Sequence, residues 1–131
     1  MVPDEYTDIL VKVNLDKSDE AFMMAELAIE RNALTSAYNR IYYSIFYIVS
    51  ALAIKHDFRT SKHIAMFEWF NKKFIKELKL FDKKIVSIYK EAFKFRQQGD
   101  YDDHFTPTLE KATELITNAK IFIDTVSKII N

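Results

Sequence analysis

The chain has 131 residues, with 19 Lys and Arg against 19 Asp and Glu, no Cys, one Gly and two Pro. A chain of this length can fold as one domain and bury a core without disulfides. The lack of cysteine excludes a disulfide scaffold and a thiol nucleophile, and so few Gly and Pro residues argue against β-sheet turns and glycine-rich phosphate loops. A nearly all-helical fold remains.

The zero net charge conceals a division along the chain. Residues 1–30 carry a net −6 and residues 99–131 a net −3, whereas residues 31–98 carry 14 basic and five acidic side chains. This basic middle could form a face for a polyanion. Alternatively, acidic and basic helices simply neighbour each other in a bundle.

The N-terminal residues have no clear pattern. A weak alternation from Ile9 to Leu15 resembles a strand, but a lone strand has no partner in this chain. We therefore treat residues 1–14 as an N-terminal segment and predict a single helical domain over residues 15–131.

The first two predicted helices follow this segment. One begins at Asp16 or Ser18, either of which could cap it, and ends at Arg31. The next covers about residues 34–56 and contains the longest uncharged run, residues 41–54. That run is shorter than the roughly 20 residues that cross a bilayer, so we expect a buried central helix.

Three further helices are predicted. A short one begins after Thr60 or Ser61 and ends in a lysine-rich stretch. The next opens at Asp82 and closes near Gly99, a candidate C-terminal cap. The last begins at Thr106, which is followed by a proline, and carries a long apolar stripe.

Short connections between these helices predict an all-α fold, namely an up-and-down four-helix bundle with an additional shorter helix that crosses one end. The acidic N-terminus lacks the apolar core of a signal peptide. We expect a cytoplasmic protein that does not contact a membrane.

The chain lacks the motifs of the common enzyme classes. His56, His63 and His104 stand in no His-x-x-x-His or Glu-x-x-His pairing, so no metal site is expected. A single glycine cannot supply a nucleophile elbow, a dinucleotide fingerprint or a P-loop. We accordingly expect no cofactor.

Most of the polar chemistry gathers in one turn, which reads RQQGDYDDH from Arg96 to His104. Arg96 could hold a phosphate bidentately, and His104 could transfer a proton near neutral pH. The alternative is a solvated helix end at which Gly99 is the cap and Arg96 pairs with Asp100 or Asp102.

Three other features each have two interpretations. The aromatic residues spaced along residues 38–47 could stack on bases, although this spacing is typical of a core helix. His63, beside Lys62, could bind an anion or be an ordinary cap or surface residue. The lysines of residues 72–84 could contact a nucleic-acid backbone or simply be solvated.

Three segments together resemble the HEPN domain family (higher eukaryotes and prokaryotes nucleotide-binding). They are AYNRIYYSIF at residues 37–46, Lys62-His63 heading a helix with Phe67 in its next turn, and RQQGDY at residues 96–101. They occur in the order of the family. The resemblance covers about residues 18–130. Within the family, the chain is similar to the small stand-alone prokaryotic members.

The resemblance implies a bundle of four to five helices that is often a homodimer. It also implies pairing with a minimal nucleotidyltransferase in two-component systems of the toxin–antitoxin type. Many members are metal-independent ribonucleases whose site is an arginine followed, after four to six intervening residues, by a histidine. The histidine handles a proton, and the arginine stabilises charge on the phosphorane.

This chain departs from that spacing. Arg96 matches the arginine of the family, but Tyr101 stands after four intervening residues and His104 only after seven. A phenol is a poor general base at neutral pH, and three nearby aspartates would repel phosphate. The motif is therefore interpreted as degraded.

The first functional hypothesis is a HEPN component that binds RNA, a nucleotide or its partner protein. Its site residues would be Arg96, Asp100, Tyr101, Lys62 and His63. One alternative is a metal-independent endoribonuclease whose catalytic residues are Arg96 and His104. A second alternative is a helical dimerisation module without a nucleic-acid role.

Overall fold

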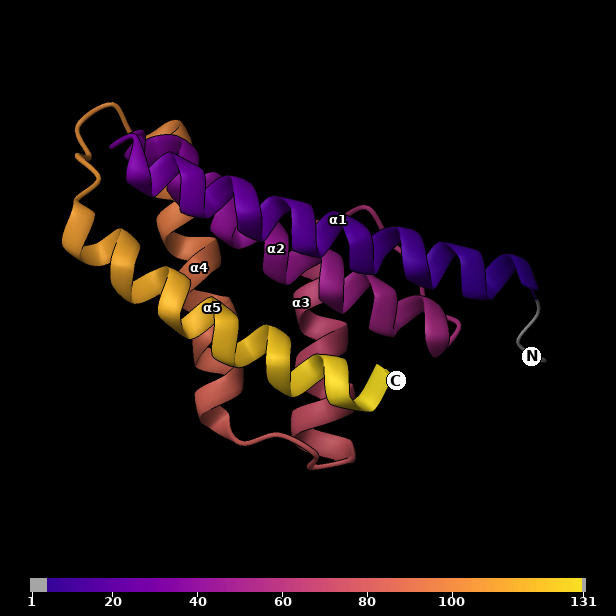
Figure 1. The fold of residues 1–131 in the computed structure, drawn as a ribbon. Helices are drawn as coiled ribbons and strands as arrows, with labels where there is room; N and C mark the ends of the chain where they lie inside the picture. Colours follow the sequence, from indigo (N-terminus) through magenta and orange to yellow (C-terminus); the bar gives the residue numbers. More distant parts are fainter. Residues whose placement is uncertain (1–4, 131) are drawn as a thin grey trace.

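The structure is a computed structural model that describes residues 5–130 (Figure 1). Within that range the chain forms helices and no strand, which confirms the predicted all-α class. The elements are α1 (Glu5–Glu30), α2 (Leu34–Lys55), α3 (His63–Phe70), the π-helix η1 (Asn71–Glu77), α4 (Lys83–Tyr101) and α5 (Leu109–Ile130).

Helix α2 lies at the centre of the bundle, as predicted. It packs against α1, α3, α4 and α5, and α1 runs antiparallel along its length (Figure 1). From Ile41 to Ile54 every residue is buried except Tyr43 and Tyr47, which are half-buried. Those two tyrosines mark the side of α2 that the other helices leave partly open.

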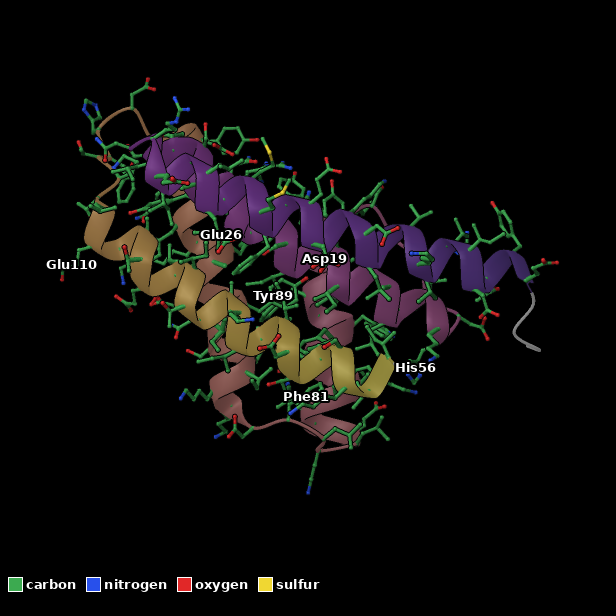
Figure 2. All side chains as sticks on the ribbon, viewed as in Figure 1. Asp19, Glu26, His56, Phe81, Tyr89 and Glu110 are labelled. Carbon is green, nitrogen blue, oxygen red and sulfur yellow. The ribbon has the colours of Figure 1, made fainter. Side chains whose placement is uncertain are left out.

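Helix α3 is more than a short segment across one end of the bundle. The π-helix η1 continues it, and the pair descends beside α4 before a short loop reverses the chain (Figure 1). Phe67 and Phe70 of α3 pack their rings 5.0 and 5.7 Å from Tyr89 of α4. Figure 2 shows Tyr89 in the interior, where it is fully buried.

The predicted start of the first helix near Asp16 or Ser18 is wrong, because α1 begins at Glu5. In its first half Val11 is buried while Ile9 and Val13 are exposed, so the apolar stripe is too thin to indicate a helix. Farther along, small buried residues let α1 approach α2 closely. Among them, the Ser18 hydroxyl donates to the Ser44 carbonyl oxygen at 2.7 Å.

Helix α4 begins as predicted and ends later than predicted. The Asp82 carboxylate accepts from the backbone N–H groups of Lys84 and Ile85 at 3.0 and 3.3 Å, which caps the helix. Gly99 is not a C-terminal cap, since α4 continues to Tyr101 and Gly99 has no positive φ. A Cβ at Gly99 would lie 3.4 Å from Tyr38 of α2, an ordinary van der Waals contact.

Helix α5 begins at Leu109 rather than at Thr106. The Thr108 hydroxyl accepts from the Lys111 backbone N–H at 3.2 Å, so this threonine, two residues beyond the predicted one, caps the helix. Over residues 5–130, none of the helices is long and apolar enough to cross a membrane.

Candidate functional site

Arg96 lies near the C-terminal end of α4, where its side chain is held among three tyrosine rings. The guanidinium carbon lies 5.7 Å from the ring of Tyr42, 5.4 Å from Tyr43 and 5.3 Å from Tyr101. Only 11% of the side chain is exposed. Cation–π contacts of this kind are stronger when the cation is removed from water.

Hydrogen bonds fix the orientation of the Arg96 guanidinium. Its Nε donates to Oδ2 of Asp100 at 3.0 Å, one helical turn away. Its Nη2 donates to the hydroxyl oxygens of Tyr43 and Tyr101 at 3.4 and 3.3 Å, and Nη1 donates to Gln97 Oε1 at 3.2 Å. The side chain is thus positioned without any ligand.

A second arginine approaches from α2. Asn39 donates through Nδ2 to Oδ2 of Asp100 at 2.9 Å, and its Oδ1 accepts from Nε and Nη2 of Arg40 at 3.1 and 2.9 Å. The Arg40 guanidinium carbon lies 5.0 Å from the centre of the Tyr43 ring. Two guanidinium groups therefore flank Tyr43, and Asp100 connects the two helices.

His63, the first residue of α3, faces the same aromatic residues of α2. Its ring centre lies 4.6 Å from that of Phe46, and Nδ1 lies 2.6 Å from the Tyr42 hydroxyl oxygen. Burial, and then the charge of Arg96, lower the pKa of His63 below its usual range. The imidazole is therefore neutral near pH 7, and Nε2 is the ring nitrogen left for a ligand.

Burial is also the main reason why the pKa of Tyr42 is strongly raised, with Tyr43 adding to it and Arg96 opposing it. The Tyr42 hydroxyl consequently keeps its proton at neutral pH. It can donate that proton to Nδ1 of the neutral imidazole, which then carries its own proton on Nε2. In this tautomer His63 presents an N–H donor rather than a base.

A surface hollow of about 500 Å³ opens beside Arg96. Its polar lining comes from Lys62, His63, Glu68, Arg96 and Gln97. The chain thus places cationic and N–H donor groups from α3 and α4 around one opening.

The structure brings together all five predicted binding residues. Lys62, His63 and Arg96 line the hollow, and Asp100 and Tyr101 both hydrogen-bond Arg96. The predicted pairing of Arg96 with Asp100 is confirmed. The binding role of these residues stays a prediction.

His104 is placed elsewhere, in the loop after α4, where it is exposed. Its backbone N–H donates to Oδ1 of Asp102 at 3.0 Å. Within residues 5–130, no hydrogen bond, ion pair or ring contact joins His104 to Arg96. The predicted catalytic pairing of Arg96 with His104 therefore gains no support from a contact, and it stays a prediction.

Sequence reasoning did not assign Asn39, Arg40, Tyr42 or Tyr43 to the site. These residues belong to the segment 37–46 that carries the family resemblance, and three- and four-residue steps place them one turn apart. The aromatic spacing favours a core helix. Tyr42 is indeed buried in the core, whereas Tyr43 is only half-buried. The polar residues between the aromatics were the available signal.

The donor set suits an anion rather than a metal ion. Across the part of the chain that the structure describes, no three His, Asp or Glu side chains cluster in a way that could hold a metal. The charged groups at the hollow and around Arg96 are the cations Arg40, Lys62 and Arg96 and the anions Glu68 and Asp100, which leaves a small excess of positive charge. A helical bundle with such an arginine site is the kind of domain that the sequence resembles.

Comparison with known proteins shows which family this is. A family model described as HEPN domain matches residues 11–129. The chain belongs to the HEPN domain family.

Relatives share most of the length of the chain. A protein of Thermotoga maritima named "UPF0332 protein" is 36% identical over 106 residues, which are 81% of this chain and 80% of that protein. "Putative toxin MJ0142" of Methanocaldococcus jannaschii is 31% identical over 114 residues, 87% of this chain and 77% of that protein. "Putative toxin MJ0605" of the same organism is 25% identical over 118 residues, 90% and 87% of the two chains.

Proposed function

We propose that this chain is the toxin-like HEPN component of a two-protein system and that its Arg96 site binds a phosphate group of RNA or of a nucleotide. Family membership and the similarity to proteins named as toxins support the first part. One observation carries the second part. A buried guanidinium, fixed in orientation by Asp100 and the tyrosines, borders a hollow that Lys62 and His63 also line.

The Arg96 guanidinium can accept a phosphate with little rearrangement. Gln97 is exposed, so its side chain can rotate away and free Nη1 for a phosphate oxygen, while Nε and Nη2 keep their partners. Charge-assisted hydrogen bonds contribute about 1.5–3 kcal/mol each when they are desolvated. The neutral His63 and the ammonium of Lys62, which line the same hollow, would supply further donors.

The partner in this proposal is a minimal nucleotidyltransferase, and the chain itself acts as a homodimer. Both follow from the resemblance to the small prokaryotic HEPN proteins. Co-expression of the two proteins should yield a stable complex that survives purification. Failure to associate would remove the partner from the proposal without affecting the phosphate site.

The toxin-like role is tested by induced expression in a bacterial host. We expect the unaltered chain to slow growth. Arg96→Ala should relieve the effect, because the variant loses the guanidinium that binds the phosphate. Arg59→Ala, in the exposed loop before α3, is the matched control and should remain toxic. Equal toxicity of the Arg96→Ala variant, with the protein folded by circular dichroism, would contradict the proposal, as would harmless expression of the unaltered chain.

A second candidate function is cleavage of RNA without a metal. It is favoured by the position of His63, whose imidazole lies in the same hollow as Arg96. In such a reaction the 2′-hydroxyl oxygen attacks phosphorus, its proton passes to a base, and the 5′-oxygen leaves with a proton from an acid. His63, in the other tautomer, in which Nδ1–H donates to the Tyr42 hydroxyl and Nε2 is free to accept a proton, and the sequence-predicted His104 are then the two candidates for proton transfer.

Cleavage assays in EDTA distinguish binding from catalysis. A ribonuclease would leave 2′,3′-cyclic phosphate ends and would lose activity in Arg96→Ala. Loss in His63→Ala but not in His104→Ala would assign proton transfer to His63. No cleavage by the unaltered chain would leave only the binding function.

A further inference from the structure

A row of side chains along the outer face of α4 leads away from the Arg96 site. Steps of four and three residues place its members on one face of the helix, and all of them are exposed. This lysine row consists of Lys83, Ser87, Lys90, Lys94, Gln97 and Tyr101. Since Gln97 also lines the hollow beside Arg96, the row is continuous with the site.

The positive charges of the lysine row are not neutralised by the protein. Over residues 5–130, Lys83, Lys90 and Lys94 form no ion pair. By contrast, Lys12 of α1 and Lys120 of α5 each pair with an aspartate one turn away, at 3.3 and 3.5 Å. Like charges at Lys90 and Lys94, one turn apart, also disfavour the helix unless an anion lies between them.

The basic character extends beyond the row to the whole α3–η1–α4 unit. Residues 62–98 contain ten Lys and Arg against four Asp and Glu, a net +6 in a chain whose total is zero. More lysines surround the turn between η1 and α4, which lies at the end of this unit remote from the C-terminal end of α4 (Figure 1). Of these, Lys72 lies 4.0 Å from Glu77 in an exposed pair, which contributes little.

The other end of the row carries an aromatic ring. Tyr101 is 70% exposed, and its hydroxyl oxygen accepts from Arg96. From Lys83 to Gln97 the helix rises about 21 Å, more than a single nucleotide can cover. A basic strip that follows a backbone, together with an exposed ring on which a base can stack, is how proteins bind single-stranded nucleic acid.

We propose that the lysine row is the binding track of a single-stranded nucleic acid. Its phosphates contact Lys83, Lys90 and Lys94, one phosphate reaches Arg96, and a base stacks on Tyr101. This inference rests on the proposed function and extends it from one phosphate group to a polymer. An acidic protein could also contact the lysines, but it would leave the exposed ring beside Arg96 unexplained.

Binding of fluorescein-labelled U12 and dT12 oligonucleotides, followed by fluorescence anisotropy over a series of salt concentrations, tests the track. We expect the triple variant K83Q/K90Q/K94Q to bind more weakly. Its slope of log K against log [salt] should fall by about 2, because three phosphate contacts on a single strand are lost. A comparison of the affinities for U12 and dT12 shows whether the chain prefers RNA or DNA.

The matched control is K12Q/K120Q/K128Q, which changes net charge equally on α1 and α5. It should keep the slope of the unaltered chain. Equal losses in both triple variants would show that only net charge matters and would overturn the proposal. An unchanged affinity in the α4 variant would also overturn it and would leave an acidic protein as the occupant of the row.

Substitution of Tyr101 tests the stacking step. Tyr101→Ala should weaken oligonucleotide binding about tenfold or more, whereas Tyr101→Phe, which keeps the ring, should retain most of the affinity. Equal affinities for the two variants would remove the stacking contact from the proposal.

Binding of uridine monophosphate separates this inference from the proposed function. The row variant should keep its affinity for the mononucleotide, because Arg96 and the hollow are intact, while it loses affinity for U12. If the unaltered chain does not bind the mononucleotide, the proposed phosphate site is contradicted. The salt dependence of oligonucleotide binding by the two triple variants then still tests whether the lysine row binds nucleic acid.

Discussion

At the scale of single residues, the site depends on the chemistry of arginine. Arg96 donates from three nitrogens to four different partners and contacts three aromatic rings. A lysine has one ammonium group and cannot make this fork of bonds. The packing around the guanidinium therefore selects arginine even before a ligand binds.

The burial of His63 makes stability depend on pH. Burial and Arg96 lower its pKa in the folded state below the ordinary 6.5, so the unfolded chain binds the proton more readily. The contribution of the neutral His63 to stability is then fully present above about pH 6.5, and it is lost as the pH falls toward the lower pKa that His63 has in the folded state. His56, whose pKa is lowered by burial and then by Lys73 and Lys55, acts in the same direction.

We therefore expect the thermal midpoint to decrease between pH 7 and pH 5, and His63→Gln to flatten that decrease in part. His104→Gln, which removes an exposed imidazole, is the control and should keep the slope of the unaltered chain. If the His63→Gln variant has the same pH dependence as the unaltered chain, His63 does not carry the proton linkage.

The residues of the site were only partly predictable. The turn at Arg96 and the Lys62–His63 pair are visible in the sequence because charged groups concentrate there. For Asn39 and Arg40 the only signal was their place between the aromatic residues of α2, since their contacts arise from the packing of α2 against α4. Contacts between residues 61 positions apart, such as Asn39 with Asp100, leave no local signal.

At the scale of elements, α4 is a single helix through Gly99. The glycine has no positive φ, and an added Cβ would make an ordinary contact at 3.4 Å from Tyr38. Gly99→Ala should therefore stabilise the protein by up to about 1 kcal/mol, because alanine favours the helix. Urea denaturation followed by circular dichroism measures this change.

Asn32 provides the contrast for that measurement. It follows α1 with φ of 57°, a left-handed conformation that costs alanine about 1–2 kcal/mol. Asn32→Ala should thus destabilise the protein while Gly99→Ala stabilises it. A loss of stability in both variants would contradict this expectation and would show that a Cβ at Gly99 does not fit against Tyr38.

The elements that the sequence predicted best are those with wide apolar faces. Helix α2, buried on nearly all sides, was predicted within a residue at each end. The first half of α1 was not, because it exposes Tyr6 and Ile9. The π-helix η1 was also missed, since no local pattern marks the change from i−4 to i−5 bonding at Leu78, whose N–H donates to the Lys73 carbonyl.

At the scale of the whole molecule, basic and acidic residues are distributed unevenly among the helices. The α3–η1–α4 unit is basic, whereas the excess of acidic residues lies in α1 and in the turn from Asp100 to Asp103, and α5 carries three acidic and three basic residues. This arrangement gives an electrically neutral protein a basic face. Asp100 lies where the two parts meet and pairs with Arg96, so it positions the arginine and partly offsets its charge.

The most direct test of the account is the affinity of labelled U12 for the unaltered chain and for Arg96→Ala and Arg96→Lys at one fixed salt concentration. If Arg96 is the phosphate-binding group, both variants should bind at least tenfold more weakly, since each loses the charge-assisted hydrogen bond from Nη1, which contributes about 1.5–3 kcal/mol. Unchanged affinity in the folded Arg96→Ala variant would contradict the account.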